Sequence, residues 1–351
     1  MQVGSIGSLN IVNGITEQRA REIFREMNEV ARRDYTSDAY ELAVKRVNMF
    51  ESLLMDKVPK IDGLLEAFGD PSFQYLLADA QRRAAASERE DDYATLTELL
   101  GCRVRHKNNR KIRAGISHAV KIVDELDDDA LCALTIFYFY KRMVPLAGMI
   151  KDGLDSLEIH AKKLLITNLP FSRDWLEHLE ILNAIRRIFF TSQPKIEETL
   201  YRNLPGYVCV GINKSGEVYT KAVELLTKQN LSASILVDHE LLDGYVRIPI
   251  SCMGQIQNIQ LDDGIAGVTR QINAQEISVL RQIWNLYSND AKQLAAVKSN
   301  FLLELQKRPT LNRIKVWWNN IPMEIEITQV GAVLAHANAQ RLDNSMPDFL
   351  E

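Results

Sequence analysis

The stretch SDAYELAVKRVNMFESLLMDKVP, residues 37–59, decides the fold class of this chain. Its apolar side chains recur at steps of three and four residues, which places them on one face of a helix: Ala39, Ala43, Val47, Phe50, Leu54 and Val58. Pro59 ends the pattern, because proline lacks a backbone donor and clashes with the preceding turn. The spacing predicts an amphipathic helix that buries one face.

Helical signals continue on both sides of this stretch. Upstream, Thr16 is a candidate N-cap for a first helix with apolar residues at the same spacing. Downstream, Asp70 followed by Pro71 is typical of a helix start, since proline is tolerated at the first helical position. We therefore expect residues 15–150 to form one all-helical domain and the fold class to be mainly α.

The remaining chain is less regular and then helical again. Residues 151–272 mix β-branched and aromatic residues with Gly and Pro, which predicts a helical and irregular region with one or two short strands. In residues 273–351 two helical patterns precede an alternating stretch, Met323 to Ile327, and a last helix that Thr328 caps. This order predicts a C-terminal, winged-helix-like domain.

Composition excludes several classes of protein. The 351 residues carry a formal net charge of −4, whereas dedicated nucleic-acid-binding domains usually have a basic surplus. The four cysteines form no C-x-x-C pair, which is typical of thiols in a cytosolic protein. The N-terminus has no signal-peptide pattern, and Lys141, Arg142 and Pro145 interrupt the most apolar segment, residues 130–150. We expect a cytoplasmic protein with a buried core helix here and no stable membrane span.

The opening segment, MQVGSIGSLNIVNGITEQ, alternates like a strand although a helix follows at once. A lone strand leaves its backbone groups unpaired, so residues 1–14 are either a disordered tail or a β segment completed by other subunits. Disordered tails rarely contain LNIV, which favours the second interpretation. It predicts a homo-oligomer joined through five apolar side chains: Val3, Ile6, Leu9, Ile11 and Val12.

The run RVRHKNNRKIR, residues 103–113, has no acidic residue and could bind phosphates of a nucleic acid or nucleotide. Six side chains would make that contact: Arg103, Arg105, Lys107, Arg110, Lys111 and Arg113. The alternative is a solvated connector between two helices. The run has no aromatic residue for base stacking and acidic stretches flank it, which favours the connector.

The segment RDWLEH contains Arg173 and His178 in the spacing that resembles HEPN-type ribonucleases. That resemblance implies a helical bundle in which the histidine handles a proton and the arginine stabilises phosphate charge. The same spacing recurs in RAGISH, residues 113–118, so the pattern arises easily by chance. Whether the protein is an enzyme stays open at this point, with Arg173 and His178 as weak catalytic candidates.

Metal and cofactor patterns are weak or missing in the sequence. Asp238, His239, Glu240 and Asp243 are the one place where histidine and carboxylates cluster, and an acidic turn at a helix start explains them equally well. The sequence has no phosphate-binding loop and no dinucleotide fingerprint. We expect no metal and no cofactor.

Several phrases spread over nearly the whole chain resemble a bacterial helical family similar to the abortive-infection alpha proteins. They are LNIVNGIT, DPSFQYLLADAQRRAA, TNLPFSRDWLEHLEILNAI and the closing ITQVGAVLAHAN, in which Ile327 replaces the more usual leucine. The resemblance implies a cytoplasmic component of anti-phage or mobile-element conflict systems. We expect a phage or host protein as a partner. The leading hypothesis is therefore a non-enzymatic, homo-oligomeric sensor or effector scaffold, with a ribonuclease or a nucleic-acid-binding module as alternatives.

Overall fold

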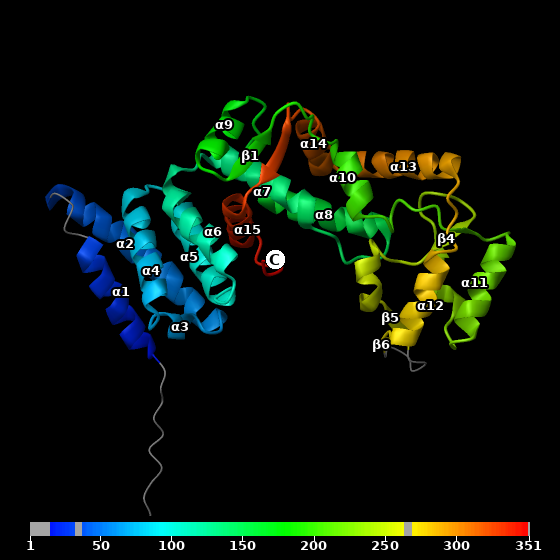
Figure 1. Cartoon of the computed structure of the whole chain (residues 1–351), viewed down its shortest axis with the longest axis horizontal. Coiled ribbons are helices and arrows are strands. Elements are labelled where there is room, and N and C mark those ends of the chain that lie inside the picture. Colours follow the sequence, from blue (N-terminus) through cyan, green and yellow to red (C-terminus); the bar gives the residue numbers. More distant parts are fainter. Residues whose placement is uncertain (1–14, 32–36, 263–268, 350–351) are drawn as a thin grey trace, which may run out of the picture. The chain divides into compact units, whose positions relative to one another are not determined.

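The computed structural model describes residues 15–31, 37–262 and 269–349, and it is mainly helical, which confirms the predicted fold class (Figure 1). The chain forms two compact units. The first comprises residues up to Asp127, Leu179–Ile185 and the stretch from Ile327 onward, and the second comprises Asp128–His178 and Arg186–Glu326. The oligomerisation segment expected at residues 1–14 lies outside the described residues.

The first unit is a helical bundle. Its elements are α1 (Glu17–Ala31), α2 (Ser37–Lys57), η2 (Val58–Lys60), α3 (Leu64–Ala67), α4 (Pro71–Ala86), α5 (Glu90–Arg105), α6 (Arg110–Ile122), η3 (Val123–Glu125) and α15 (Gln329–Leu342). Helix α2, the predicted amphipathic helix, packs against α4 and α5, and the apolar residues of its stripe from Ala43 to Leu54 are buried. Burial of this stripe is the main source of stability for such a helix.

Local signals set the ends of several helices in this unit as predicted. The Thr16 hydroxyl accepts a hydrogen bond from Arg19 N, and Asp70 accepts hydrogen bonds from the first amides of α4. The last helix begins in the same way, because the Thr328 hydroxyl accepts a hydrogen bond from Gly331 N. These caps satisfy amides that the helix itself leaves unpaired.

The second unit combines helices with short strands. Its helices are α7 (Asp128–Arg142), α8 (Ile150–Leu164), α9 (Asp174–Ile181), whose last turn belongs to the first unit, α10 (Ile196–Asn203), α11 (Glu217–Thr227), α12 (Ala274–Trp284), α13 (Ala291–Gln306) and α14 (Pro309–Trp318), with the short turns η4 (Ala233–Ile235) and η5 (Met253–Asn258). Helix α7 is buried from Ala130 to Tyr140, as expected for a core helix. No helix among the described ranges is long and apolar enough to span a bilayer.

The strands of the chain form three small sheets. They pair as β1 (Ile185–Ile188) with β7 (Glu324–Ile327), β2 (Ile212–Asn213) and β3 (Val237–Asp238) on either side of β4 (Tyr245–Arg247), and β5 (Gln260–Asp262) with β6 (Thr269–Gln271). The last two sheets are antiparallel. The middle region thus contains more short strands than the one or two that we expected.

The expected C-terminal domain, residues 273–351, does not form one winged-helix-like unit. Three helices, α12, α13 and α14, precede strand β7 where two were expected. Strand β7 pairs with β1, and α15 packs against α5 and α6 in the first unit. The chain therefore divides near residues 127 and 327 and not at the expected boundaries of 150 and 272. The reason is that α15 finds its apolar partners more than 200 residues earlier in the sequence.

Candidate functional site

The hairpin between β3 and β4 in the second unit forms one wall of a groove. Val237 and Asp238 pair with Arg247 and Val246, and the intervening loop closes with a hydrogen bond from His239 N to Tyr245 O of 2.9 Å. Gly244 adopts φ of 78° in this loop, a left-handed conformation that favours glycine. The hairpin places the cluster predicted from sequence, Asp238 to Asp243, at its tip.

His239 holds the hairpin in place and is not available as a ligand. Its ring is buried, its Nε2 lies 2.8 Å from Cys209 O, and its Nδ1 accepts a hydrogen bond from Leu241 N. Nε2 therefore carries the proton and donates to the carbonyl, so the ring is neutral. Burial lowers the pKa of His239 and raises the pKa of the Cys209 thiol to about 11. A protonated thiol is a poor nucleophile, so these two residues are not a catalytic pair.

Glu240 connects the hairpin to the start of α8. Its carboxylate accepts hydrogen bonds from Ile150 N and Lys151 N, the first amides of that helix, where a negative charge is favourable. It also pairs with Arg247 at 3.3 Å. The predicted acidic cluster therefore diverges, and the described residues contain no group of three or more potential metal ligands.

Arg247 is completely buried and holds several loops of the second unit together. Its guanidinium donates to the carbonyl oxygens of Gly148, Gly206, Ile248 and Ile250, and it also lies over the ring of Tyr207. A buried charge is tolerated when it is paired and hydrogen-bonded. Both terminal nitrogens of this guanidinium are hydrogen-bonded, whereas its Nε has no partner among the described residues. These contacts link the hairpin to the loops at Gly148, Gly206 and Ile250.

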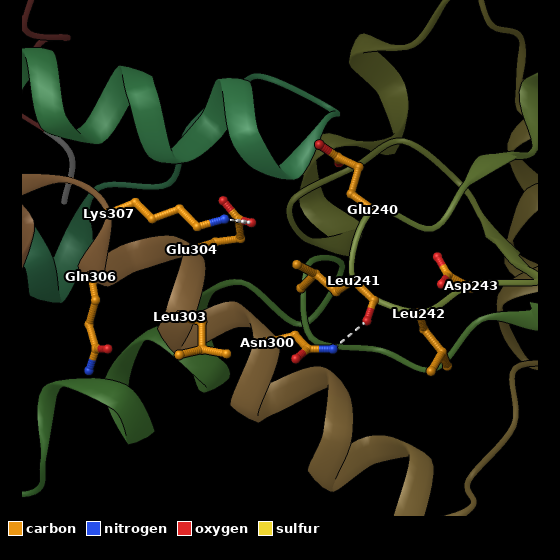
Figure 2. Close-up of a pocket in the computed structure, with 9 residues that line it drawn as sticks. All are labelled: Glu240, Leu241, Leu242, Asp243, Asn300, Leu303, Glu304, Gln306 and Lys307. Carbon is orange, nitrogen blue, oxygen red and sulfur yellow. Dashed lines mark hydrogen bonds and ion pairs between the residues drawn. The ribbon is translucent and has the colours of Figure 1, made fainter.

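Helix α13 forms the opposite wall, and the groove between them has a volume of about 790 Å³ (Figure 2). The Asn300 side chain donates to Leu241 O at 2.9 Å, and Lys307 pairs with Glu304 at 2.6 Å. Leu303 is 55% exposed on the groove side of the helix. The lining residues are Glu240, Leu241, Leu242, Asp243, Asn300, Leu303, Glu304, Gln306 and Lys307. Leucines beside amide and carboxylate groups suit the binding of a polypeptide segment.

The two weak catalytic candidates lie elsewhere in the second unit. Arg173 is exposed just before α9, and its carbonyl accepts hydrogen bonds from Leu176 N and Glu177 N. His178 is half-buried within the helix. Neither residue lines the groove.

The basic run of residues 103–113 does not act as one surface. Arg103 is buried and donates to the Ser72 hydroxyl at 2.9 Å, and Arg113 donates to the same hydroxyl at 3.3 Å. Arg105 contacts Gln340 and Asp348 in the C-terminal segment. The exposed members are Lys107, in the turn between α5 and α6, and Arg110 and Lys111, at the start of α6. The run therefore comprises the end of α5, a short turn and the start of α6.

Our sequence reasoning missed the groove residues of α13 and the role of Arg247. One signal was present in VKSNFLLELQK, residues 297–307: Val297, Phe301 and Leu305 form the buried stripe of the helix, and Leu303 lies off that stripe. Single exposed apolar residues are common on protein surfaces, so Leu303 indicates a binding surface only once the structure shows the groove beside it. Arg247 gave no comparable signal, because its partners other than Glu240 are backbone carbonyls.

Comparison with known proteins identifies the family of the chain. No curated protein and no solved structure matches the chain. One protein-family model, whose “-like” description names no activity, matches residues 14–349. Because this match covers nearly the whole sequence, the chain belongs to that family.

Proposed function

We propose that this protein is a non-catalytic binding protein that acts as a homo-oligomeric sensor or effector scaffold in bacterial anti-phage defence. The observation that carries the proposal is the groove between the β3–β4 hairpin and α13. Its walls are held by hydrogen bonds of Glu240, His239 and Arg247, and its lining exposes Leu303 to solvent. A preorganised groove with apolar and amide groups reduces the entropy lost when a partner segment binds.

The proposed ligand is a polypeptide segment of a phage or host protein. An apolar side chain of that segment contacts Leu303 and Leu242, and its backbone pairs with the amides of Asn300 and Gln306. The defence context and the cytoplasmic location rest on the resemblance of the sequence to abortive-infection alpha proteins. Self-association rests on the apolar residues of segment 1–14, such as Leu9 and Ile11.

The groove is tested by phage challenge of cells that express the wild type or Leu303→Asp. The substitution places a charge at the apolar part of the groove and is expected to abolish protection. Ile159→Asp is the matched control, because Ile159 is also 55% exposed, on α8. Equal loss of protection in both variants, or undiminished protection by Leu303→Asp, contradicts the assignment of the groove.

Self-association is tested by light scattering of the intact chain and of a chain that lacks residues 1–14. The proposal predicts an oligomer for the intact chain and a smaller species for the shortened one. If both elute as the same monomer, the scaffold model fails.

A further inference from the structure

A small polar cavity in the first unit lies between segments that are far apart in the sequence. It has a volume of about 120 Å³ and is lined by Lys57, Lys60, Ile61, Glu98, Arg105, Gln340 and Asn344. These residues come from the end of α2, from η2 and the residue after it, from α5, and from the end of α15 and the loop that follows it. The fold therefore assembles a site that no single stretch of sequence contains.

The cavity has an excess of positive charge, because three cations line it with one carboxylate. Lys57 pairs with the buried Glu98 at 2.5 Å, so these two charges balance. Lys60 is exposed and makes no ion pair with any residue that the structure describes. Among the lining side chains the excess comes from Lys60 and Arg105, and Asp348, which does not line the cavity, partly balances Arg105.

Arg105 has hydrogen-bonding capacity left. One guanidinium nitrogen donates to Gln340 Oε1 at 3.2 Å, but the buried Nε has no hydrogen-bond partner among the described residues. Asp348 lies 3.2 Å from this Nε, and its side chain is 69% exposed. An ion pair with so exposed a carboxylate contributes little, so a better acceptor can displace it.

We propose that this cavity binds a phosphate-class oxyanion. The Arg105 guanidinium and the Lys60 ammonium donate charge-assisted hydrogen bonds to its oxygens, and the Asn344 amide supplies a neutral donor. A space of about 120 Å³ has room for one phosphoryl group.

This site differs from the basic run of residues 103–113, which the sequence analysis considered as a phosphate-binding segment. Only Arg105 of the six basic residues in that run lines the cavity. Arg103 and Arg113 are engaged by Ser72, and Lys111 is exposed at the start of α6. Lys60, which lies 45 residues before Arg105, replaces them as the second cation.

The test uses the full-length protein with inorganic phosphate as the probe, in calorimetric titrations at constant ionic strength set with sodium chloride. We expect saturable binding by the wild type and an affinity about tenfold lower for Lys60→Glu, because the variant places a like charge beside the anion. Lys60→Gln removes the charge without reversing it and is expected to have a smaller effect. Since Lys60 is exposed, neither change disturbs the core.

The matched control is Lys111→Glu, which makes the same charge reversal in the basic run and is expected to bind phosphate like the wild type. A second arm replaces phosphate with phenyl phosphate: tighter binding of the ester identifies a phosphorylated molecule as the ligand, and tighter binding of the free ion identifies phosphate itself. Absence of saturable binding of both probes by the wild type, or equal weakening by Lys111→Glu and Lys60→Glu, overturns the proposal.

Discussion

Each of the two units of this protein is stabilised internally by a different kind of interaction. In the first unit, long helices bury apolar stripes against one another, and α5 is buried along most of its length. In the second unit, the loops around the groove depend on Arg247, His239 and Glu240, whose side chains bind backbone groups. The packing of the first unit can be predicted from the spacing of its apolar residues. The loops of the second unit depend on a few polar side chains that each have several hydrogen-bond partners.

The chain offers a direct way to observe the units separately. Its four tryptophans, Trp175, Trp284, Trp317 and Trp318, all belong to the second unit. Tryptophan fluorescence therefore follows unfolding of that unit, whereas far-ultraviolet circular dichroism follows both.

The largest effect is expected for Arg247→Ala. The substitution removes hydrogen bonds to the carbonyls of four residues, of which Ile248 O and Gly206 O keep one other donor each, and leaves Glu240 without its buried cation. We expect the free energy of unfolding of the second unit to fall by about 4 kcal/mol. Urea unfolding followed by tryptophan fluorescence measures it, and a change below 1 kcal/mol would show that the loops are held by other contacts.

Leu99→Ala probes the apolar core of the first unit. Leu99 is completely buried on α5, so its truncation leaves a cavity and costs about 3 kcal/mol. The circular dichroism transition of the first unit should move to lower urea, while the fluorescence transition stays in place. If both transitions move together, the units unfold as one and the comparison between them is wrong.

A smaller effect is expected for the cap of α6. The Asn109 side chain accepts hydrogen bonds from Lys111 N and Ile112 N. Asn109→Ala removes this acceptor and should destabilise the first unit by about 1 kcal/mol in urea unfolding. Lys111→Ala changes an exposed side chain in the same turn and serves as the control, with no measurable change expected.

The smallest effect at neutral pH comes from His239 and grows as the pH falls. Burial lowers the pKa of this ring in the folded protein, so the neutral ring stabilises the fold above the unfolded pKa of about 6.5. This contribution is lost as the pH falls from about 6.5 through the lower folded pKa. Fluorescence-detected unfolding at several pH values should show the decline, and His239→Gln, which has no imidazole to protonate, should show less of it. An identical decline in both proteins would assign the pH dependence to other groups.

Sequence patterns predict the helices of the first unit because each depends on local spacing and on nearby caps such as Thr16 and Asp70. They do not predict that α15 completes that unit. Helix α15 packs against α5 and α6, which lie more than 200 residues earlier in the sequence, and local spacing carries no information about such distant contacts. The groove could not be predicted from the sequence either. Its hairpin was noticed as a cluster of Asp238, His239, Glu240 and Asp243, but the partners that give these residues their roles are backbone groups, which have no signature in the sequence.

The central claim is that the groove, and not a catalytic pair, carries the function. Phage challenge with Leu303→Asp and His178→Ala side by side tests this most directly, with plaque counts as the readout and equal protein levels checked by immunoblot. The account predicts that the wild type and His178→Ala protect equally and that Leu303→Asp does not protect. Protection that survives Leu303→Asp and is lost in His178→Ala, or a wild type that gives no protection, would contradict it.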